Sequence, residues 1–312
     1  MPVVLDPDAA AVYKAFLEAN RPPYENGTPA QAREMYLAAR FVSNPEPPEL
    51  ESAKELAIPA PHGSIPARIY TPKTLRKKDG LAPCLVFFHG GGWVIGNLDS
   101  HDVVCRKLAH EGELIVISVD YRLAPEHRFP AAVEDALAAT QWIASHAREL
   151  GIDAARLSVG GDSAGGNLAA VTALAARAKG PKLASQVLIY PATDFAMNTS
   201  SHSEPETSIL LTHSVVKWFC NHYLGGADIN DWRASPARAK LEGLPPAYVL
   251  VAGADPLRDE GNEYAERLKQ AGVPVTYRYF PGQFHGFFTM GKLLNQANIA
   301  ASEISAWLKA QG

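Results

Sequence analysis

The sequence has few cysteines and no long hydrophobic run, and each shortage excludes a class of protein. Its 312 residues include three cysteines, Cys84, Cys105 and Cys220, which are odd in number and far apart. Scattered, unpaired cysteines lead us to expect reduced thiols and a cytoplasmic protein. No stretch approaches the ~20 apolar residues of a membrane-spanning helix. Residues 1–8 also lack the cationic stretch and apolar core of a secretory signal, so we expect no membrane partner.

Charge of one sign is also missing. The chain carries 29 Lys and Arg against 33 Asp and Glu, a net charge of −4 with the signs interspersed. Without a basic footprint, nucleic acid is not an expected partner. No His or Cys pairs stand at metal-ligand spacing, so we expect no metal. A hydrophobic content of 47% suits one large α/β domain with an appended cap.

The most informative segment is residues 159–167, Val-Gly-Gly-Asp-Ser-Ala-Gly-Gly-Asn. It places Ser163 between a short apolar strand at 156–160 and an alanine-rich helix at 164–178. This is the pattern of a nucleophile elbow, a turn so tight that only small residues fit two positions before and after the serine. A Gly-x-Ser-x-Gly also occurs by chance in many chains. The assignment of Ser163 as a nucleophile therefore needs support from elsewhere in the sequence.

A glycine-rich segment upstream supplies part of that support. Residues 89–93, His-Gly-Gly-Gly-Trp, follow an apolar strand-like run at 85–88. Glycines let backbone N–H groups face a ligand, and acyl transfer needs such donors where a carbonyl oxygen becomes an alkoxide. Gly91 and Gly92, with Ala164 beside the serine, are the expected oxyanion-hole donors. A flexible loop or a phosphate cradle are the alternatives, and no Gly-Lys-Ser/Thr follows to favour the cradle.

Chain order identifies the other members of a triad, which on this type of fold runs Ser, then acid, then His. Asp255 follows the apolar strand 248–251, and beyond it His285 is the one remaining histidine. Ser163 would attack a carbonyl carbon, His285 would move the proton, and Asp255 would orient the imidazole. Asp259 and Glu260 compete as the acid, but both fall at the start of the next helix, where the helix dipole favours acidic residues.

Three further polar residues near these motifs have structural interpretations. His89 precedes Asp255 and breaks the chain order, so we expect it to hold the glycine loop in shape. Asp162 adjoins the nucleophile, and its side chain should point away from the serine and bind a buried partner. Asp194 either lines the site or anchors a loop, and the sequence does not decide between the two.

Alternation of strand-like and helical segments predicts the fold class. We expect α/β architecture with a mostly parallel eight-stranded sheet flanked by helices, and an antiparallel hairpin formed by its first two strands. The expected strands are 52–58, 65–71, 84–88, 114–119, 156–160, 186–190, 247–252 and 275–280, and the expected helices are 99–111, 131–149, 164–178, 261–271 and 297–310.

A helical cap is expected over the site. Residues 1–48 would form its amino-terminal helices, and residues 49–312 would form the core, with a second cap element at about 198–225. Asp6 and Pro7 begin the first helix, with the Asp6 side chain as its cap. Thr28 and Gln31 are spaced as a capping box at the start of the second.

These motifs together resemble the bacterial hormone-sensitive-lipase-like (family IV) carboxylesterases. The segments that carry the resemblance are 89–93, 121–126, 129–132, 161–166, 255–257 and 285–287, and it extends from about residue 59 onward. The Asp before the serine is typical of one branch of that family. The resemblance implies an α/β-hydrolase fold with a helical cap, oxyanion donors at Gly91, Gly92 and Ala164, and cofactor-free hydrolysis of short- to medium-chain acyl esters.

Other functions are compatible with the same residues. A Ser-His-Asp triad also hydrolyses amides, lactones and carbamates, and the cap pocket that would discriminate among them is not visible in the sequence. A non-catalytic small-ligand binder on this fold is an alternative of another class, against which the presence of His285 argues. Dehalogenases and epoxide hydrolases need an aspartate in place of Ser163. Residues 275–280 form the expected edge strand, so a homodimer paired through this edge is considered as well.

Overall fold

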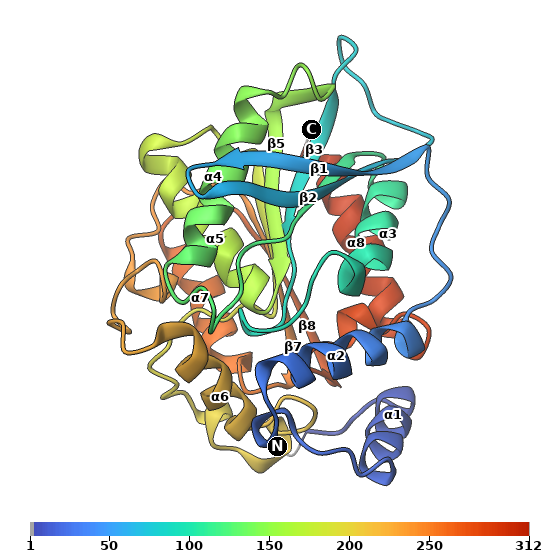
Figure 1. Cartoon of the computed structure of the whole chain (residues 1–312), viewed down its shortest axis with the longest axis vertical. Helices are drawn as coiled ribbons and strands as arrows, with labels where there is room; N and C mark the ends of the chain where they lie inside the picture. Colours follow the sequence, from blue (N-terminus) through green and yellow to red (C-terminus); the bar gives the residue numbers. More distant parts are fainter. Residues whose placement is uncertain (1–2, 312) are drawn as a thin grey trace.

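An eight-stranded sheet forms the centre of the molecule in this computed structural model, which describes residues 3–311 (Figure 1). The first two residues of the expected amino-terminal region and the last residue of the expected core lie outside the described residues. The spatial order of the strands is β1-β2-β4-β3-β5-β6-β7-β8. Their bounds are β1 (Ser52–Ala60), β2 (Gly63–Thr71), β3 (Ala82–Phe88), β4 (Ile115–Val119), β5 (Ile152–Asp162), β6 (Ser185–Ile189), β7 (Ala247–Ala254) and β8 (Val275–Phe284).

Each expected strand overlaps one of these, and the mostly parallel sheet is confirmed. β1 and β2 form the expected antiparallel hairpin, with Ala60 opposite Gly63 at the turn, and β2 is antiparallel to β4. The remaining neighbours are parallel. β8 lies at the sheet edge, as the sequence predicts.

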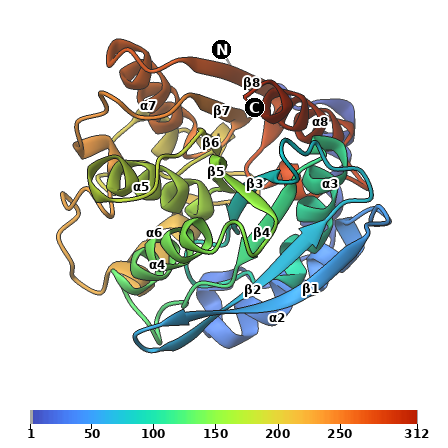
Figure 2. The same ribbon diagram turned by 90° about the horizontal axis from the view of Figure 1, so that it is seen from above.

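Helices cover both faces of the sheet, as Figure 2 shows. One face is covered by α3 (Asp102–Gly112) and α8 (Asn295–Ala310), and the other by α4 (Ala131–Ser145), α5 (Ala164–Lys179) and α7 (Arg258–Gln270). The expected helix 131–149 is wrong at its end. After Ser145 the chain makes turns, with the Leu150 and Ile152 N–H groups donating to the carbonyls of His146 and Ala147.

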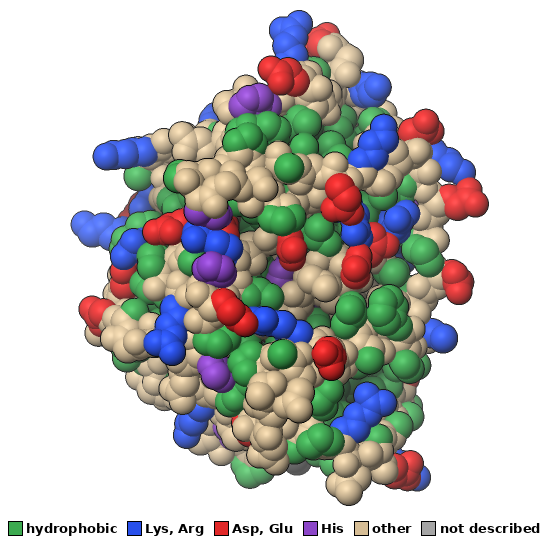
Figure 3. Space-filling model, in the orientation of Figure 1, with side chains coloured by type: hydrophobic (Ala, Val, Ile, Leu, Met, Phe, Trp, Pro, Cys, Tyr) green, Lys and Arg blue, Asp and Glu red, His purple; other side chains and the backbone are tan. Residues whose placement is uncertain are grey.

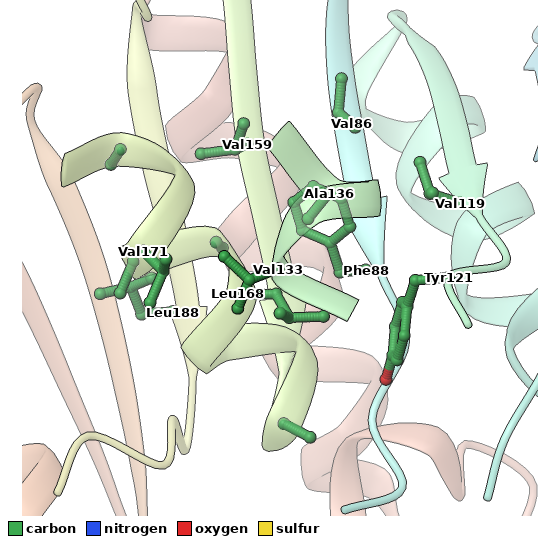
Figure 4. Close-up of a cluster of buried hydrophobic side chains, with 14 of the residues drawn as sticks. Val86, Phe88, Val119, Tyr121, Val133, Ala136, Val159, Leu168, Val171 and Leu188 are labelled. Atoms are coloured by element: carbon green, nitrogen blue, oxygen red, sulfur yellow. The ribbon is translucent and has the colours of Figure 1, made fainter. Parts of the chain in front are cut away.

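The core is built from strands that are apolar on both sides. Every residue of β3 is buried, which is typical of a central parallel strand with helices on both faces. Figure 4 shows Val86 and Phe88 of β3 beside Val159 of β5 and Leu168 of α5. α5 itself is buried around most of its circumference, because its alanines and glycines let it lie close to the sheet.

Three helices gather at the end of the sheet where β5 runs into α5 (Figure 1). These are α1 (Pro7–Glu18), α2 (Pro29–Ser43) and α6 (His213–Leu224). The segment between α1 and α2 contacts α6, because the Ser214 hydroxyl donates to Glu25 and the rings of Tyr24 and Phe219 lie 6.4 Å apart. The division between cap and core at residues 48 and 49 stays a prediction.

The two expected helix starts differ in outcome. The Thr28 capping box is confirmed, since Thr28 Oγ1 accepts from the Gln31 N–H and Gln31 Oε1 accepts from the Thr28 N–H. The expected Asp6 side-chain cap is wrong. Asp6 is followed by Pro7 at the start of α1, but its carboxylate accepts a hydrogen bond from Gln283 Nε2 at 2.9 Å instead. The reason is tertiary, because the Asp6 N–H also donates to the Gly282 carbonyl of β8.

The surface carries both signs of charge, and Figure 3 shows Lys and Arg interspersed with Asp and Glu over one face. Among residues 3–311 there is no helix with the length and apolar character needed to cross a membrane. Cys84, Cys105 and Cys220 are buried and free.

Candidate active site

Ser163 lies on a sharp turn between β5 and α5. Its backbone has φ 57° and ψ −117°, a strained conformation for a residue with a side chain, and such strain concentrates at functional sites. The flanking glycines are required by close approach. A Cβ on Gly161 would lie 2.4 Å from the carbonyl oxygen of Phe88, and one on Gly165 would lie 1.8 Å from the same atom. The tight turn expected from the sequence is therefore present.

His285 and Asp255 converge on the serine from the ends of two neighbouring strands. The distance between His285 Nε2 and Ser163 Oγ is 2.8 Å, and that between His285 Nδ1 and Asp255 Oδ2 is 2.7 Å. Asp255 follows β7, is fully buried, and accepts a second hydrogen bond from the Leu257 N–H. The structure thus brings together the three residues that chain order selected, in the geometry of nucleophile, base and orienting acid.

The two competing acids lie elsewhere. Asp259 accepts from Arg258 Nε and from the Ser201 N–H. Glu260 Oε2 lies 2.7 Å from His202 Nε2, and burial raises the pKa of Glu260 despite this histidine. These two carboxylates therefore anchor the segment around residues 193–202, and neither hydrogen-bonds His285.

Asp162 holds the glycine loop in place by a hydrogen bond to its backbone. Its Oδ1 accepts from the Gly90 N–H at 2.9 Å and lies 3.1 Å from Nε2 of the buried His101. Burial alone would raise the pKa of the Asp162 carboxyl, but His101 and the Gly90 N–H keep it below its usual range. Asp162 is thus a buried structural partner, as expected. Asp194 is bound to Arg238, which favours its reading as a loop anchor, although it also lines the cavity described below.

His89 shapes the same loop. Its ring is fully buried, its Nδ1 lies 2.8 Å from the Gly90 carbonyl oxygen, and it stacks on Tyr121 at 4.3 Å. Burial, assisted by the neighbouring His101, lowers the pKa of His89 to about 3. The imidazole is therefore neutral at pH 7, which suits the structural role expected of it.

The carboxylate of Asp120 lies 3.8 Å from His89 Nε2, and its ionisation should make the stability of the protein depend on pH. Burial, followed by repulsion from Asp99, raises the pKa of Asp120 to about 6. A raised pKa favours folding when the carboxyl is protonated, and this contribution is lost as the pH rises through about 6. Asp120→Asn should therefore raise the melting temperature at pH 7.5 by about 1–2 °C, the effect of ~1 kcal/mol in a chain of 312 residues.

The control for this prediction is the pH itself. At pH 4 the carboxyl is protonated in the folded state, so the wild type and Asp120→Asn should unfold at nearly the same temperature. Thermal unfolding followed by circular dichroism at both pH values measures the difference. An equal gain at both values would contradict the ionisation argument.

The expected oxyanion donors belong to the glycine loop and to the start of α5. Gly91 and Gly92 line the same cavity as Ser163 and His285, and Ala164 begins α5 directly after the serine. Among residues 3–311, the N–H groups of Gly91 and Gly92 have no hydrogen-bond acceptor, whereas the Gly90 N–H donates to Asp162. Two backbone donors of the cavity wall are therefore free of a protein acceptor among residues 3–311, and their role as oxyanion donors stays a prediction.

Gly92 offers a test of this loop. It has φ 57°, and a Cβ there would lie 2.2 Å from Cγ of Phe219 in α6. Gly92→Ala should displace its N–H group and lower kcat for an acetyl ester by about 10²-fold, the usual effect of losing one oxyanion donor. The measurement is steady-state kinetics on p-nitrophenyl acetate, with the melting temperature as a check of folding.

A matched double variant separates the clash from the loss of glycine. In the double variant Gly92→Ala with Phe219→Ala, the ring that the new Cβ would meet is gone. The loss of kcat caused by Gly92→Ala should therefore be smaller in the Phe219→Ala background than in the wild type. Wild-type kcat in the single variant Gly92→Ala would show that the loop does not depend on this close contact.

One cavity of about 900 Å³ opens onto these groups. Its walls come from α1, α2, α6 and the glycine loop, and most of the lining is apolar. Within the part of the chain that the structure describes, no group of three or more His, Cys, Asp or Glu side chains is placed to hold a metal ion. The lining includes Val12, Phe16, Met35, Tyr36, Arg40, Gly91, Gly92, Ser163, Val215, Phe219, His285 and Met290.

Sequence reasoning missed several residues around the site. His101 and His202 had no local signal, because their carboxylate partners are 61 and 58 positions away in the chain. For Arg40 the sequence holds a partial signal, because Arg40 lies on the same side of α2 as the apolar Tyr36, four residues earlier. A charged residue on an apolar helix face could have been noted from the sequence.

Comparison with known proteins places this geometry among ester hydrolases. Residues 85–289 match a family model described as the α/β hydrolase fold. The chain is 44% identical to the carboxylic ester hydrolase LipN of Mycobacterium tuberculosis, over 89% of this chain and 76% of that protein. It is 38% identical to an ethyl acetate hydrolase of Pseudomonas putida, over 94% of this chain and 95% of that protein.

Comparison with solved structures also finds an ester hydrolase. An ester hydrolase from the metagenome of Lake Arreo superposes with a TM-score of 0.93 at 41% identity, covering 98% of this chain and 99% of that one. The likeness extends over the helices α1, α2 and α6 as well as the sheet, because almost the whole of both chains is matched.

Proposed function

Because this chain belongs to the hormone-sensitive-lipase-like (family IV) carboxylesterases of the α/β-hydrolase fold, we propose that Ser163, His285 and Asp255 perform its ester hydrolysis. The chain is a carboxylic ester hydrolase. The observation that carries the residue assignment is the pair of short contacts from His285, 2.8 Å to Ser163 Oγ and 2.7 Å to Asp255 Oδ2.

In the acylation half of the reaction, Ser163 Oγ attacks the ester carbonyl carbon while His285 Nε2 takes the hydroxyl proton. Asp255 keeps the ring proton on Nδ1 and stabilises the imidazolium that forms. The carbonyl oxygen becomes an oxyanion that accepts from the N–H groups of Gly91, Gly92 and Ala164. The intermediate collapses when His285 gives its proton to the leaving alcohol.

Deacylation repeats these steps with water as the nucleophile. His285 Nε2 takes a proton from the water, the hydroxyl group adds to the acyl carbon, and the same oxyanion donors bind the second intermediate. Collapse breaks the bond to Ser163 Oγ, which recovers its proton from His285, and the carboxylic acid leaves. No metal or cofactor takes part in this scheme.

The proposed substrates are esters of short- to medium-chain acyl groups. Support comes from the cavity of about 900 Å³ lined by α1, α2 and α6, which offers a mostly apolar site. The similarity to an ethyl acetate hydrolase supports the short end of this range. We further propose a cytoplasmic location, supported by three buried free thiols, and a homodimer paired through the edge strand β8.

The experiment is a series of p-nitrophenyl esters from acetyl to palmitoyl, assayed by release of p-nitrophenol. We expect kcat/KM to peak at a short or medium chain and to be unchanged by EDTA. A palmitoyl optimum would keep the triad but make the enzyme a lipase. Failure of the folded protein to hydrolyse any of these esters would overturn the proposal.

A further inference from the structure

Arg40 is a charged side chain without a counter-charge in the wall of the catalytic cavity. It is 6% exposed, and it is the one buried arginine or lysine among residues 3–311. No carboxylate of those residues forms an ion pair with it. By contrast, the partly buried Arg68, Arg122 and Arg258 each pair with at least one carboxylate.

The contacts of Arg40 leave most of its hydrogen-bonding capacity unused. A guanidinium has five N–H donors. One nitrogen, Nη1, donates to Thr289 Oγ1, the plane lies over the Tyr36 ring at 4.6 Å, and Nε is buried without an acceptor. No other hydrogen bond of this side chain to residues 3–311 is present. Since arginine stays protonated, a buried guanidinium with so few acceptors is unfavourable unless something in the cavity binds it.

The position of Arg40 ties it to the reaction centre. Thr289, which holds the guanidinium, in turn donates to the Gly286 carbonyl, one residue after His285. Tyr36 of α2 lies under the guanidinium, and Met290, directly after Thr289, lines the same cavity as Arg40. A ligand group bound here would therefore lie in the same cavity as an ester at Ser163.

The carboxylates of the cavity already have partners. Four of its carboxylates are satisfied by neighbouring residues, so none of them is left to neutralise Arg40. Asp162 is bound by the Gly90 N–H and His101, Asp194 by Arg238, Glu260 by His202, and Asp8 by the N–H groups of Ala9 and Asn295. Arg40 thus provides a fixed positive charge on an otherwise mostly apolar wall.

We propose that Arg40 binds a carboxylate at the far end of the substrate's apolar chain, so that the preferred substrates are esters carrying a terminal carboxylate, such as half-esters of aliphatic dicarboxylic acids. The planar fork of an arginine suits a carboxylate, and the apolar lining suits the methylene chain between the two ends. This inference rests on the proposed ester hydrolysis at Ser163, and it adds a substrate class to it.

The test compares charged and neutral esters of the same length. Monoethyl adipate and ethyl hexanoate are assayed by ethanol release with the wild type and Arg40→Gln. We expect Arg40→Gln to lower kcat/KM for monoethyl adipate by about 10- to 100-fold, the range for a hydrogen bond to a charged group, mainly through KM. The value for ethyl hexanoate should change by less than about threefold. 6-Acetoxyhexanoate, which carries its carboxylate on the alcohol side, tells which half of the ester reaches Arg40.

Two matched variants sharpen the comparison. Arg21→Gln removes an exposed arginine at the cavity and should leave the preference for the charged ester unchanged. Arg40→Lys keeps the charge and should retain part of that preference. An equal loss for charged and neutral esters in Arg40→Gln would overturn the proposal, because Arg40 would then act as a tether between α2 and the His285 segment.

A binding measurement keeps this inference separate from the catalytic proposal. Adipate, which is not an ester, should bind the wild type more tightly than Arg40→Gln by the same 10- to 100-fold in calorimetry, since this rests on the same charged hydrogen bond. If no ester is hydrolysed but adipate shows this dependence, the catalytic proposal fails and the carboxylate site stands. If neutral esters are hydrolysed but adipate binds both proteins equally, the carboxylate site is overturned.

Discussion

Ser163→Ala should lower kcat for p-nitrophenyl acetate by about 10⁶-fold, since the residual rate of such enzymes comes from the oxyanion hole and binding alone. The chemical reason is that no other hydroxyl is held within hydrogen-bond distance of His285 Nε2 among residues 3–311. The melting temperature should change little, because His285 is the one hydrogen-bond partner of the Ser163 hydroxyl among the described residues and the small alanine fits the turn. Steady-state kinetics and a thermal melt of both proteins measure the two effects.

Ser158→Ala is the matched control for this variant. Ser158 is a buried serine of the same strand β5, hydrogen-bonded to Ser185 and outside the cavity. Its loss should lower stability and leave kcat close to that of the wild type. A second readout is covalent labelling by an ester-like phosphonate, which should add one group to the wild type and none to Ser163→Ala. Retained turnover in Ser163→Ala would falsify the nucleophile assignment.

The sequence predicts the site where its requirements are local. The turn at Ser163 leaves no room for a Cβ at Gly161 or Gly165, so the glycines are visible in the sequence as a motif. The places of Asp255 and His285 follow from topology, because each comes directly after a strand of a parallel sheet and such ends share one edge. These constraints act within a few residues or through the strand order, and both leave a pattern that can be recognised.

Side-chain partners that come from distant segments leave no such pattern. The Asp6 carboxylate forms its hydrogen bond with Gln283, 277 positions away, although its local context is that of a helix cap. The Gly90 loop is held by Asp162, 72 positions later in the chain. This contact, and that of Asp162 with His101, can be recognised only once β3 and β5 are known to be adjacent. The place of Arg40 in the cavity likewise depends on how α2 packs on the His285 segment.

Asp255→Asn should lower kcat by about 10⁴-fold with little change in the fold. Asp255 accepts two hydrogen bonds, one from the Leu257 N–H and one from His285 Nδ1. An amide keeps the first contact by using its oxygen, which turns its NH₂ group toward the histidine. His285 Nδ1 must then accept, so the ring proton moves to Nε2 and the base can no longer take a proton from Ser163.

Glu260→Gln is the control that decides between the two acids. Glu260 is buried and paired with His202, so its loss should lower the melting temperature by loosening the segment around residues 193–202. Its effect on kcat should stay below about tenfold, because it contacts neither Ser163 nor His285 and such indirect effects are small beside loss of a triad member. If Glu260→Gln lowered kcat more than Asp255→Asn does, the orienting acid would have to be reassigned. The short contact between Asp255 and His285 argues that it will not, since the tautomer of an imidazole is set by the group that its other nitrogen faces.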